Sequence, residues 1–139
     1  MGNKASPTPT PETQPYWDGA SARELRIQRC TACREFYFYP RPFCPRCGSA
    51  AVEWVTVSGR AKLHSYVISH RPAPGFEEEA PYAIAVVALE EGPRLMSNIV
   101  EIENTPENLV LDMDLEVTFQ ARGDRCVPVF RPAAAEPVR

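Results

Sequence analysis

The sequence lacks the features that would place it in several common functional classes. No run of about 18 apolar residues, long enough to span a bilayer, occurs in the chain, and no secretory signal is recognisable. Acidic residues outnumber basic ones, and the net charge of −3 excludes the broad basic surface of a general nucleic-acid binder. At 139 residues the chain holds one ordinary domain or two very small ones. We expect a soluble, cytoplasmic protein.

Groups suited to catalysis are also scarce. The two histidines, His64 and His70, lie in a strand-like stretch with no recognisable nucleophile motif beside it. The acidic run at residues 77–79 lacks the two separate environments that a catalytic acid and base require. Cys126 has no pairing partner and is better explained as a small buried side chain than as a nucleophile. We expect no catalytic residues and no enzymatic activity from this chain alone.

What the sequence does contain is a pair of Cys-x-x-Cys motifs. Cys30 with Cys33, and Cys44 with Cys47, can direct four thiolates at one centre, as a tetrahedral structural zinc site requires. A reducing compartment disfavours disulfides, and the proline-rich surroundings disfavour a redox motif. We therefore predict structural Zn²⁺ in a zinc ribbon. A four-thiolate iron site needs the same ligands and stays an alternative.

Each cysteine pair needs a tight turn directly after it. Gly48 follows the second pair, and glycine suits the positive φ of such a turn. Arg34 stands in the equivalent place after the first pair. The first turn must therefore either find another geometry or hold a non-glycine residue in a strained one.

The rest of the chain divides into a polar start, a helix and a run of strands. Residues 1–15, rich in proline, serine and threonine, are predicted to be a disordered tail or linker. Residues 16–29 are predicted to form an amphipathic N-terminal helix, capped by Asp18 or Ser21 and leading into the metal site. The zinc ribbon, the barrel and a disordered tail are expected at residues 30–50, 51–132 and 133–139.

Alternating apolar residues indicate a mainly β protein after the ribbon. Strands are predicted at residues 52–57, 60–69, 82–89, 94–102, 115–119 and 126–130. Residues 82–89 are apolar enough for a buried strand, and residues 72–81 are typical of a loop. Thr105, Pro106 and Glu107 predict a short helix or turn. The expected architecture is a helix and a rubredoxin-like ribbon followed by a small OB-fold β-barrel.

The ribbon end carries a local excess of arginine over acid. Guanidinium groups suit phosphate or carboxylate, so this end could meet coenzyme A or an acidic partner surface, although the arginines could equally serve only to solvate the module. Nearby aromatic residues could pack in the core or anchor a partner. The residues expected to face a partner or CoA are Tyr16, Trp17, Arg29, Arg34, Phe36, Tyr37, Phe38, Arg41 and Arg46.

Several segments together resemble the acyl-CoA-associated zinc-ribbon and OB-fold family known as domain of unknown function 35. The resemblance runs from about Tyr16 to Pro132. It is carried by Leu25-Arg26-Ile27-Gln28-Arg29-Cys30, Tyr39-Pro40-Arg41-Pro42-Phe43-Cys44-Pro45-Arg46-Cys47-Gly48, Val57-Ser58-Gly59-Arg60-Ala61, Pro81-Tyr82-Ala83-Ile84-Ala85-Val86-Val87 and Val129-Phe130-Arg131-Pro132. Two positions depart from the family pattern: Arg34 replaces a glycine, and Asp112-Met113-Asp114 replaces a Gly-Met-Pro-like turn.

The resemblance implies an accessory subunit of a hetero-oligomer. Family members accompany thiolases, thiolase-like lyases and acyl-CoA hydratases. In steroid-degrading bacteria a similar domain follows a hydratase domain through a linker and binds a thiolase-like aldolase. On this basis we expect a partner that is a thiolase-like carbon–carbon lyase acting on acyl-CoA in steroid side-chain degradation. Alternative partners are an acyl-CoA hydratase or a biosynthetic thiolase.

A nucleic-acid-binding ribbon and OB module is the competing hypothesis. The aromatic residues from Phe36 to Phe38 could stack on bases. The missing basic groove ranks this function below the accessory role.

Overall fold

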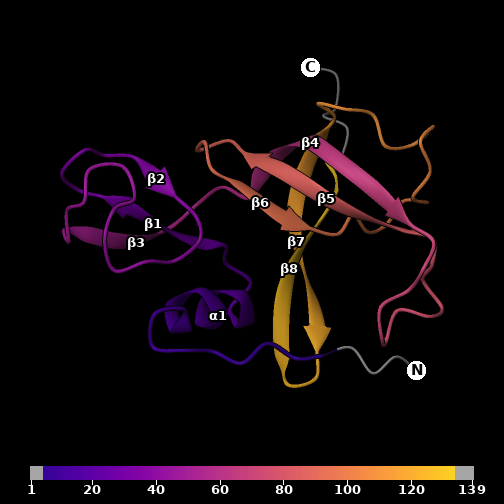
Figure 1. Cartoon of the computed structure of the whole chain (residues 1–139), viewed down its shortest axis with the longest axis horizontal. Helices are drawn as coiled ribbons and strands as arrows, with labels where there is room; N and C mark the ends of the chain where they lie inside the picture. The colour runs from indigo at the N-terminus through magenta and orange to yellow at the C-terminus, as the bar shows by residue number, and fades with distance from the viewer. Residues whose placement is uncertain (1–4, 134–139) are drawn as a thin grey trace, which may run out of the picture.

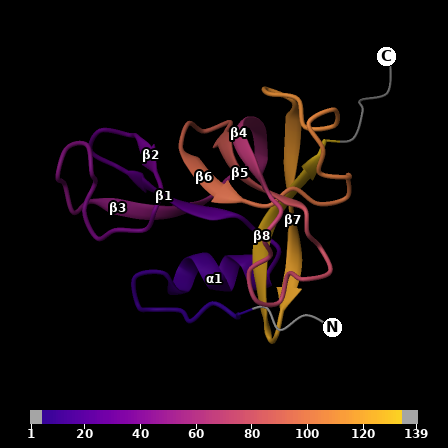
Figure 2. The ribbon, with the colours of Figure 1, turned by 45° about the vertical axis from the view of Figure 1, so that its right-hand side comes forward.

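The computed structural model describes residues 5–133 and contains one helix and two β-sheets within that range (Figure 1). A small three-stranded sheet lies to one side of a larger five-stranded sheet, and the helix lies next to both the small sheet and the larger sheet's last strand (Figures 1 and 2). Among the described residues, no helix is both long and apolar enough to cross a bilayer.

The helix α1 (Gln14–Ser21) is shorter than predicted and begins earlier. Pro15 lies in its first turn, where a missing backbone N–H costs nothing. Neither Asp18 nor Ser21 caps its start, because both lie inside it, and Thr13 is the N-cap. The predicted helix through residue 29 is wrong: Arg23 adopts a φ of 61°, and the Glu24 N–H donates to the Gly19 carbonyl at 2.7 Å, which turns the chain back.

Residues that were expected to be helical instead form the central strand of the ribbon. β1 (Arg26–Cys30) pairs with β2 (Phe36–Tyr37) on one side and with β3 (Val52–Thr56) on the other. The buried Leu25 and Ile27 are two residues apart, which is the period of a strand rather than of a helix. Since β3 pairs with β1, it belongs to the ribbon sheet and not, as expected, to the barrel.

The larger sheet has the strand order β6-β5-β4-β7-β8. β4 (Arg60–Ser69) and β5 (Tyr82–Leu89) have the predicted bounds, and the connection between them is a loop as expected. β6 (Arg94–Ser97) is shorter than predicted, whereas β7 (Asp114–Arg122) and β8 (Arg125–Pro132) are longer. The segment at residues 105–107 forms a turn, in which the Asn108 N–H donates to the Thr105 carbonyl.

The five strands curl into a partly closed, OB-like barrel. Ile99 bridges Phe130 of β8, and the Ser97 hydroxyl donates to the Pro128 carbonyl at 3.1 Å, so the two edges of the sheet meet. The interior is filled by apolar side chains from every strand of the sheet, including Leu63, Val87, Leu95, Leu115 and Phe130. Burying each such side chain contributes about 1.5–3 kcal/mol.

The N-terminal segment is shorter as a tail than expected, because residues 14 and 15 belong to α1. Ser6 donates its hydroxyl to the Arg122 carbonyl at 2.9 Å, which places this segment against the β7–β8 hairpin (Figure 1). Residues 1–4, the start of the expected N-terminal tail, and residues 134–139, all but the first residue of the expected C-terminal tail, lie outside the described residues.

Candidate metal centre and docking surface

The four predicted cysteines converge on one point of the ribbon. Their Sγ atoms all lie within 4.8 Å of one another, with 3.5 Å between Cys30 and Cys47 and 3.7 Å between Cys33 and Cys44. Tetrahedral Zn–S bonds of about 2.3 Å require sulfur atoms roughly 3.8 Å apart. Within residues 5–133, these cysteines form the one group of candidate ligands close enough to hold a metal ion. The donor set and its spacing fit structural zinc.

The two cysteine turns have the same hydrogen-bond pattern. The N–H of Cys33 approaches Cys30 Sγ at 3.4 Å, and the N–H of Cys47 approaches Cys44 Sγ at 3.5 Å. The residue after each pair, Arg34 or Gly48, donates its N–H to the carbonyl of the first cysteine at 2.8 or 2.9 Å. Backbone donors around the sulfurs stabilise thiolates and orient them toward a metal.

The ionisation of the four cysteines explains why a cation would bind at this point. The backbone N–H of Cys33 is the main cause that lowers the pKa of the Cys30 thiol to about 6. For Cys33 the N–H of Glu35 acts in the same direction, but burial and the neighbouring sulfurs prevail and raise its pKa to about 12. Four thiolates cannot coexist so closely without a positive charge, and a divalent metal ion supplies it.

All four ligand positions of a tetrahedral metal would be filled by sulfur. A catalytic zinc keeps one position open for water or substrate. The site can therefore stabilise the fold of the ribbon, but it offers no position at which a substrate could be activated.

The residues expected to face a partner fall into buried and exposed groups. Tyr16 and Tyr37 are buried, at 8% and 6% exposure, and the Tyr37 hydroxyl donates to the Arg41 carbonyl at 2.8 Å. Trp17, Phe36 and Phe38 are half-buried against the core. Tyr16 packs on Phe38 at 5.4 Å between ring centroids, so these two rings connect α1 to the ribbon.

The arginines of the predicted set lie on the ribbon surface. Arg34, Arg41 and Arg46 are exposed, whereas Arg29 lies over the Phe36 ring at 5.4 Å and donates to the Arg34 carbonyl. Arg46 approaches Glu35 only at 3.9 Å, an exposed ion pair of little energetic weight. A hollow of about 350 Å³ opens here, lined by Glu35, Phe36, Tyr37, Cys44, Pro45 and Arg46. The ribbon thus presents guanidinium groups beside an aromatic hollow.

Sequence reasoning missed two exposed aromatic rings and one buried amide of the ribbon. Tyr39 and Phe43 are 52% and 57% exposed and lie in the connection between the cysteine pairs. Gln28 is buried, and its Oε1 accepts the Arg41 N–H at 2.6 Å, which holds that connection against β1. The signal for Gln28 was a polar residue in an otherwise apolar strand; nothing in the sequence separated Tyr39 and Phe43 from their buried neighbours.

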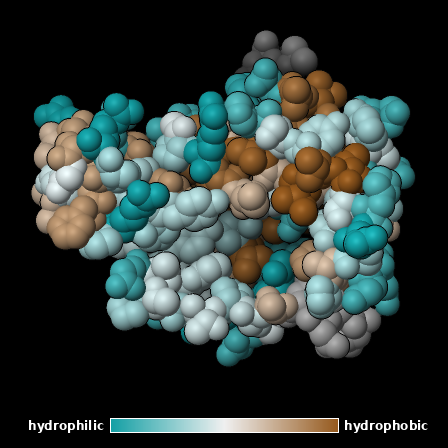
Figure 3. All heavy atoms as spheres, in the orientation of Figure 1, coloured by the Kyte–Doolittle hydropathy of each residue, from teal (hydrophilic) through white to brown (hydrophobic). Residues whose placement is uncertain are grey.

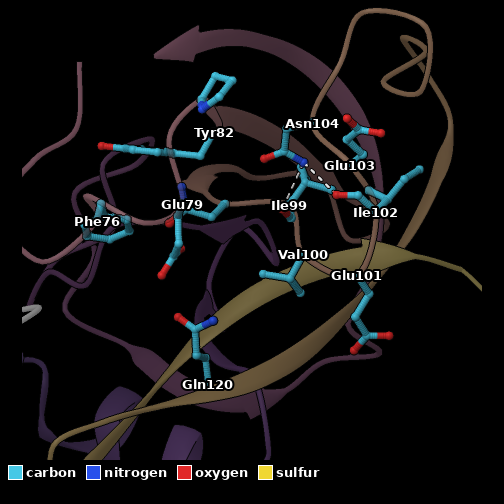
Figure 4. A pocket seen from close by; sticks show the side chains of 12 residues that line it. Phe76, Glu79, Tyr82, Ile99, Val100, Glu101, Ile102, Glu103, Asn104 and Gln120 are labelled. Carbon is cyan, nitrogen blue, oxygen red and sulfur yellow. Dashed lines mark hydrogen bonds between the residues drawn. The ribbon is translucent and has the colours of Figure 1, made fainter. Parts of the chain in front are cut away.

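A second hollow, also of about 350 Å³, lies on the barrel and has an acidic wall (Figure 4). Asn104 shapes it by donating to the carbonyls of Ile99 and Ile102 while accepting the Ala83 N–H at 2.8 Å. Glu79 and Gln120 point into the hollow, and Tyr82 and Phe76 flank it (Figure 4). No lysine, arginine or histidine lines it, so this hollow does not suit the phosphates of CoA.

Two family models cover most of the chain. Residues 17–53 match the model described as "ChsH2, rubredoxin-like zinc ribbon domain". Residues 54–120 match "ChsH2, C-terminal OB-fold domain". Both confirm the fold class expected from the sequence.

Three relatives have similar sequences. A "Probable enoyl-CoA hydratase alpha subunit" of Thermomonospora curvata is 37% identical over 87% of this chain and 37% of its own. A "DUF35 domain-containing scaffold protein" of Methanothermobacter thermautotrophicus is 33% identical over 78% of this chain and 82% of its own. A "3-oxo-4,17-pregnadiene-20-carboxyl-CoA hydratase alpha subunit" of Mycobacterium tuberculosis is 33% identical over 81% of this chain and 35% of its own. The chain thus spans just over a third of the two hydratase subunits.

One solved structure superposes along nearly the whole chain. It is described as "Ltp2-ChsH2(DUF35) aldolase", is 35% identical, and gives a TM-score of 0.82 over 93% of this chain and 100% of its own.

Proposed function

Since the chain belongs to the DUF35 family and has the zinc-ribbon and OB-fold domains of ChsH2, we propose that it is an accessory subunit of a thiolase-like acyl-CoA enzyme. It binds a carbon–carbon lyase of the aldolase type and supports the assembly, the acyl-CoA channel and the activity of that enzyme. The observation that carries the proposal is the similarity, over 93% of this chain and 100% of the matched chain, to the structure described as "Ltp2-ChsH2(DUF35) aldolase".

The composition of the candidate site supports a non-catalytic role. All four cysteines are needed as metal ligands, so the metal has no position for a substrate. His64 and His70 are both exposed, and neither donates or accepts a side-chain hydrogen bond among the described residues. The residues that break the carbon–carbon bond therefore belong to the partner.

The substrate class follows from the relatives. The M. tuberculosis relative is named for a steroid acyl-CoA, and the T. curvata relative for an enoyl-CoA. We propose that the partner acts on a CoA thioester of a steroid side chain. We also propose a cytoplasmic location, because four closely spaced free thiols persist in a reducing compartment.

The exposed arginines of the ribbon give the proposal a contact surface. Arg34, Arg41 and Arg46 can reach an acidic surface of the partner or the phosphates of CoA held by it. Trp17, Phe36 and Phe38 are half-buried and pack against the core, so they would hold this surface in place and expose only part of their rings to a partner. Tyr16 and Tyr37 would act through packing, since they are buried, and the half-buried Arg29 would do so by lying over the Phe36 ring.

An acyl-CoA hydratase is a second candidate partner. Two relatives are named hydratase alpha subunits, and each is much longer than this chain. Ser6 of the N-terminal segment contacts the β7–β8 hairpin, so a hydratase attached to or bound near this segment would lie at that end. We propose that the hydratase and the lyase act on successive intermediates within one assembly.

Co-expression with the thiolase-like enzyme of the same organism tests the proposal. We expect the two chains to co-elute on size exclusion, and carbon–carbon cleavage of a steroid β-hydroxyacyl-CoA to need both. Cleavage by the isolated chain at the rate of the mixture would overturn the non-catalytic role. Full activity of the enzyme without this chain, or no co-elution, would overturn the accessory role.

Binding to nucleic acid is a weaker alternative. Tyr37 is buried and Phe36 is covered by Arg29, so the aromatic span that was expected to stack on bases is largely engaged. We expect no salt-dependent shift of single-stranded RNA or DNA at low ionic strength. A shift that weakens as salt rises would favour this function instead.

A further inference from the structure

The sheet face that points away from the barrel core is apolar. Residues of β5 alternate between the two faces, and the odd-numbered Ala83, Ala85 and Val87 are fully buried inside. The even-numbered Ile84 and Val86 point outward, beside Val67 of β4 and Met96 of β6 according to the strand register. We call these four residues, Val67, Ile84, Val86 and Met96, the outer apolar face.

The outer apolar face is open to solvent among the described residues. Val67 and Met96 are each 62% exposed, and Ile84 is 37% exposed. The sequence predicted a buried strand for residues 82–89, and five of these eight residues are buried, while Val86 is half-buried and Ile84 is exposed on the outer face. Apolar atoms gather over β4, β5 and β6 in the space-filling view (Figure 3). A contiguous exposed apolar patch on a sheet is typical of a binding surface.

A row that contains two basic residues borders this face. Lys62, Ala88 and Arg94 lie side by side across β4, β5 and β6, one row before Val86 and Met96. Lys62 already binds Asp114, with 2.7 Å between Nζ and Oδ1. Arg94 is exposed and forms no ion pair within the described part of the chain, so its guanidinium is free to bind a carboxylate.

The charge pattern argues against a second copy of this chain as the occupant. Two copies packed through this face would need a free carboxylate to receive each Arg94. On β4, β5 and β6 the rows that form the face contain Lys62, Ser65, Val67, Ile84, Val86, Ala88, Arg94 and Met96, and none of these residues is acidic. The Lys62 row continues on β7 with Asp114, but this carboxylate is already paired with Lys62 at 2.7 Å. A different protein, with an apolar surface bordered by a carboxylate, complements both parts of the face.

We propose that the outer apolar face is the surface through which the chain docks on its thiolase-like partner, with Arg94 bound to a carboxylate of that enzyme. The inference rests on the proposed function and adds the surface that performs it. It assigns the main apolar contact to the barrel, beside the charged contact that the ribbon arginines make with the same partner or with CoA held by it.

Acidic substitutions on this face, with conservative controls, test the inference. Met96→Glu combined with Val67→Glu should weaken binding to the co-expressed thiolase-like enzyme by at least about tenfold, as loss of a central apolar contact does. Met96→Leu should bind as the original chain does. Arg94→Glu should also weaken binding, and Arg94→Lys should largely retain it, because it keeps the charge. Each variant should hold zinc and unfold at an unchanged temperature, since the altered side chains are exposed.

The possible failures are distinguishable. If the unaltered chain does not bind the enzyme, the proposed function fails. If it binds, and the folded Val67→Glu/Met96→Glu variant binds equally well, the proposed function stands and this docking face is overturned. If sedimentation instead shows a dimer of this chain that the double variant dissociates, the occupant is a second copy and the proposal is overturned.

Discussion

Arg34 and Gly48 occupy the same position in the two cysteine turns and share a left-handed backbone, with φ of 67° and 79°. Each donates its N–H to the carbonyl of the first cysteine of its pair. Of the two outcomes allowed by the sequence, the strained one is correct. Asp112, the other departure from the family's glycine pattern, also has a positive φ, at 69°. Both departures keep the backbone geometry of glycine without its freedom.

Replacing Arg34 by glycine should stabilise the ribbon slightly. A left-handed conformation costs a non-glycine residue about 1–2 kcal/mol. Glycine removes this cost, but about half of the gain is lost because glycine makes the unfolded chain more flexible. We expect a net gain of about 0.5 kcal/mol in the free energy of unfolding, measured in urea with saturating zinc. Arg34→Ala is the control, because it removes the same side chain but keeps the strain. Equal stability of the two variants would contradict the explanation.

Gly59 is required for a second reason besides its φ of 81°. A Cβ atom at this position would overlap the Val117 side chain, whereas a Cβ at Gly48 would meet no atom within 4 Å. Gly48→Ala should cost about 1 kcal/mol for the backbone alone, and Gly59→Ala about 1–3 kcal/mol more for overpacking. Urea unfolding of the two variants measures the difference. Adding Val117→Ala should remove most of the excess cost of Gly59→Ala, and an unchanged excess would contradict the steric explanation.

The strands of the barrel could be predicted from the sequence because local signals bounded them. β4 and β5 alternate apolar residues and are flanked by turn formers, Gly59 before β4 and Pro81 before β5. The metal site could be predicted for a similar reason, since cysteine spacing alone specifies the ligands. The observed grouping of Cys30, Cys33, Cys44 and Cys47 confirms that prediction.

The failures came from tertiary pairing, which local patterns do not encode. The two-residue spacing of Leu25 and Ile27 is too short a signal to separate a strand from a helix, and residues 26–30 form a strand because β2 and β3 pair with them on either side. The assignment of β3 to the ribbon depends on its pairing with β1. The predicted buried strand at residues 82–89 is buried at five of its eight residues, and the partial exposure of Ile84, Val86 and Ala88 depends on which elements cover the sheet.

Removing one metal ligand should unfold the ribbon while the barrel stays folded. Cys44→Ser is expected to lose stoichiometric zinc and the fold of the ribbon, because metal binding contributes folding free energy directly. Cys126→Ser is the matched control, since Cys126 lies on β8 outside the metal group. Metal analysis measures the zinc, and strong visible absorption of the purified chain would identify iron instead. We also expect Cys44→Ser to weaken partner binding, because the ribbon arginines lose their positions; normal assembly of a zinc-free variant would contradict this.

Tyr16 should make the fold sensitive to alkaline pH. Burial, and to a lesser degree the charge of Tyr39, raises the pKa of the Tyr16 phenol well above its ordinary value of 10.0. A group whose pKa is higher in the folded state than in the unfolded state stabilises the fold below the unfolded pKa. That contribution is lost as the pH rises, because the unfolded chain releases the proton first, at about 1.4 kcal/mol per pH unit above pH 10. Tyr16→Phe removes the titrating hydroxyl but keeps the ring that packs on Phe38.

We therefore expect Tyr16→Phe to lose less stability than the original chain between about pH 10 and pH 11.5, and to differ little from it near pH 8. Chemical unfolding at each pH, with zinc present throughout, measures the two curves. Tyr66→Phe serves as the control, since Tyr66 lies on β4 of the barrel and the substitution removes a hydroxyl while leaving Tyr16 and Tyr39 unchanged. Parallel curves for the original chain and Tyr16→Phe would show that the Tyr16 hydroxyl stays out of the titration. A divergence confined to high pH would show that ionisation of Tyr16, whose ring joins α1 to the ribbon, destabilises the fold.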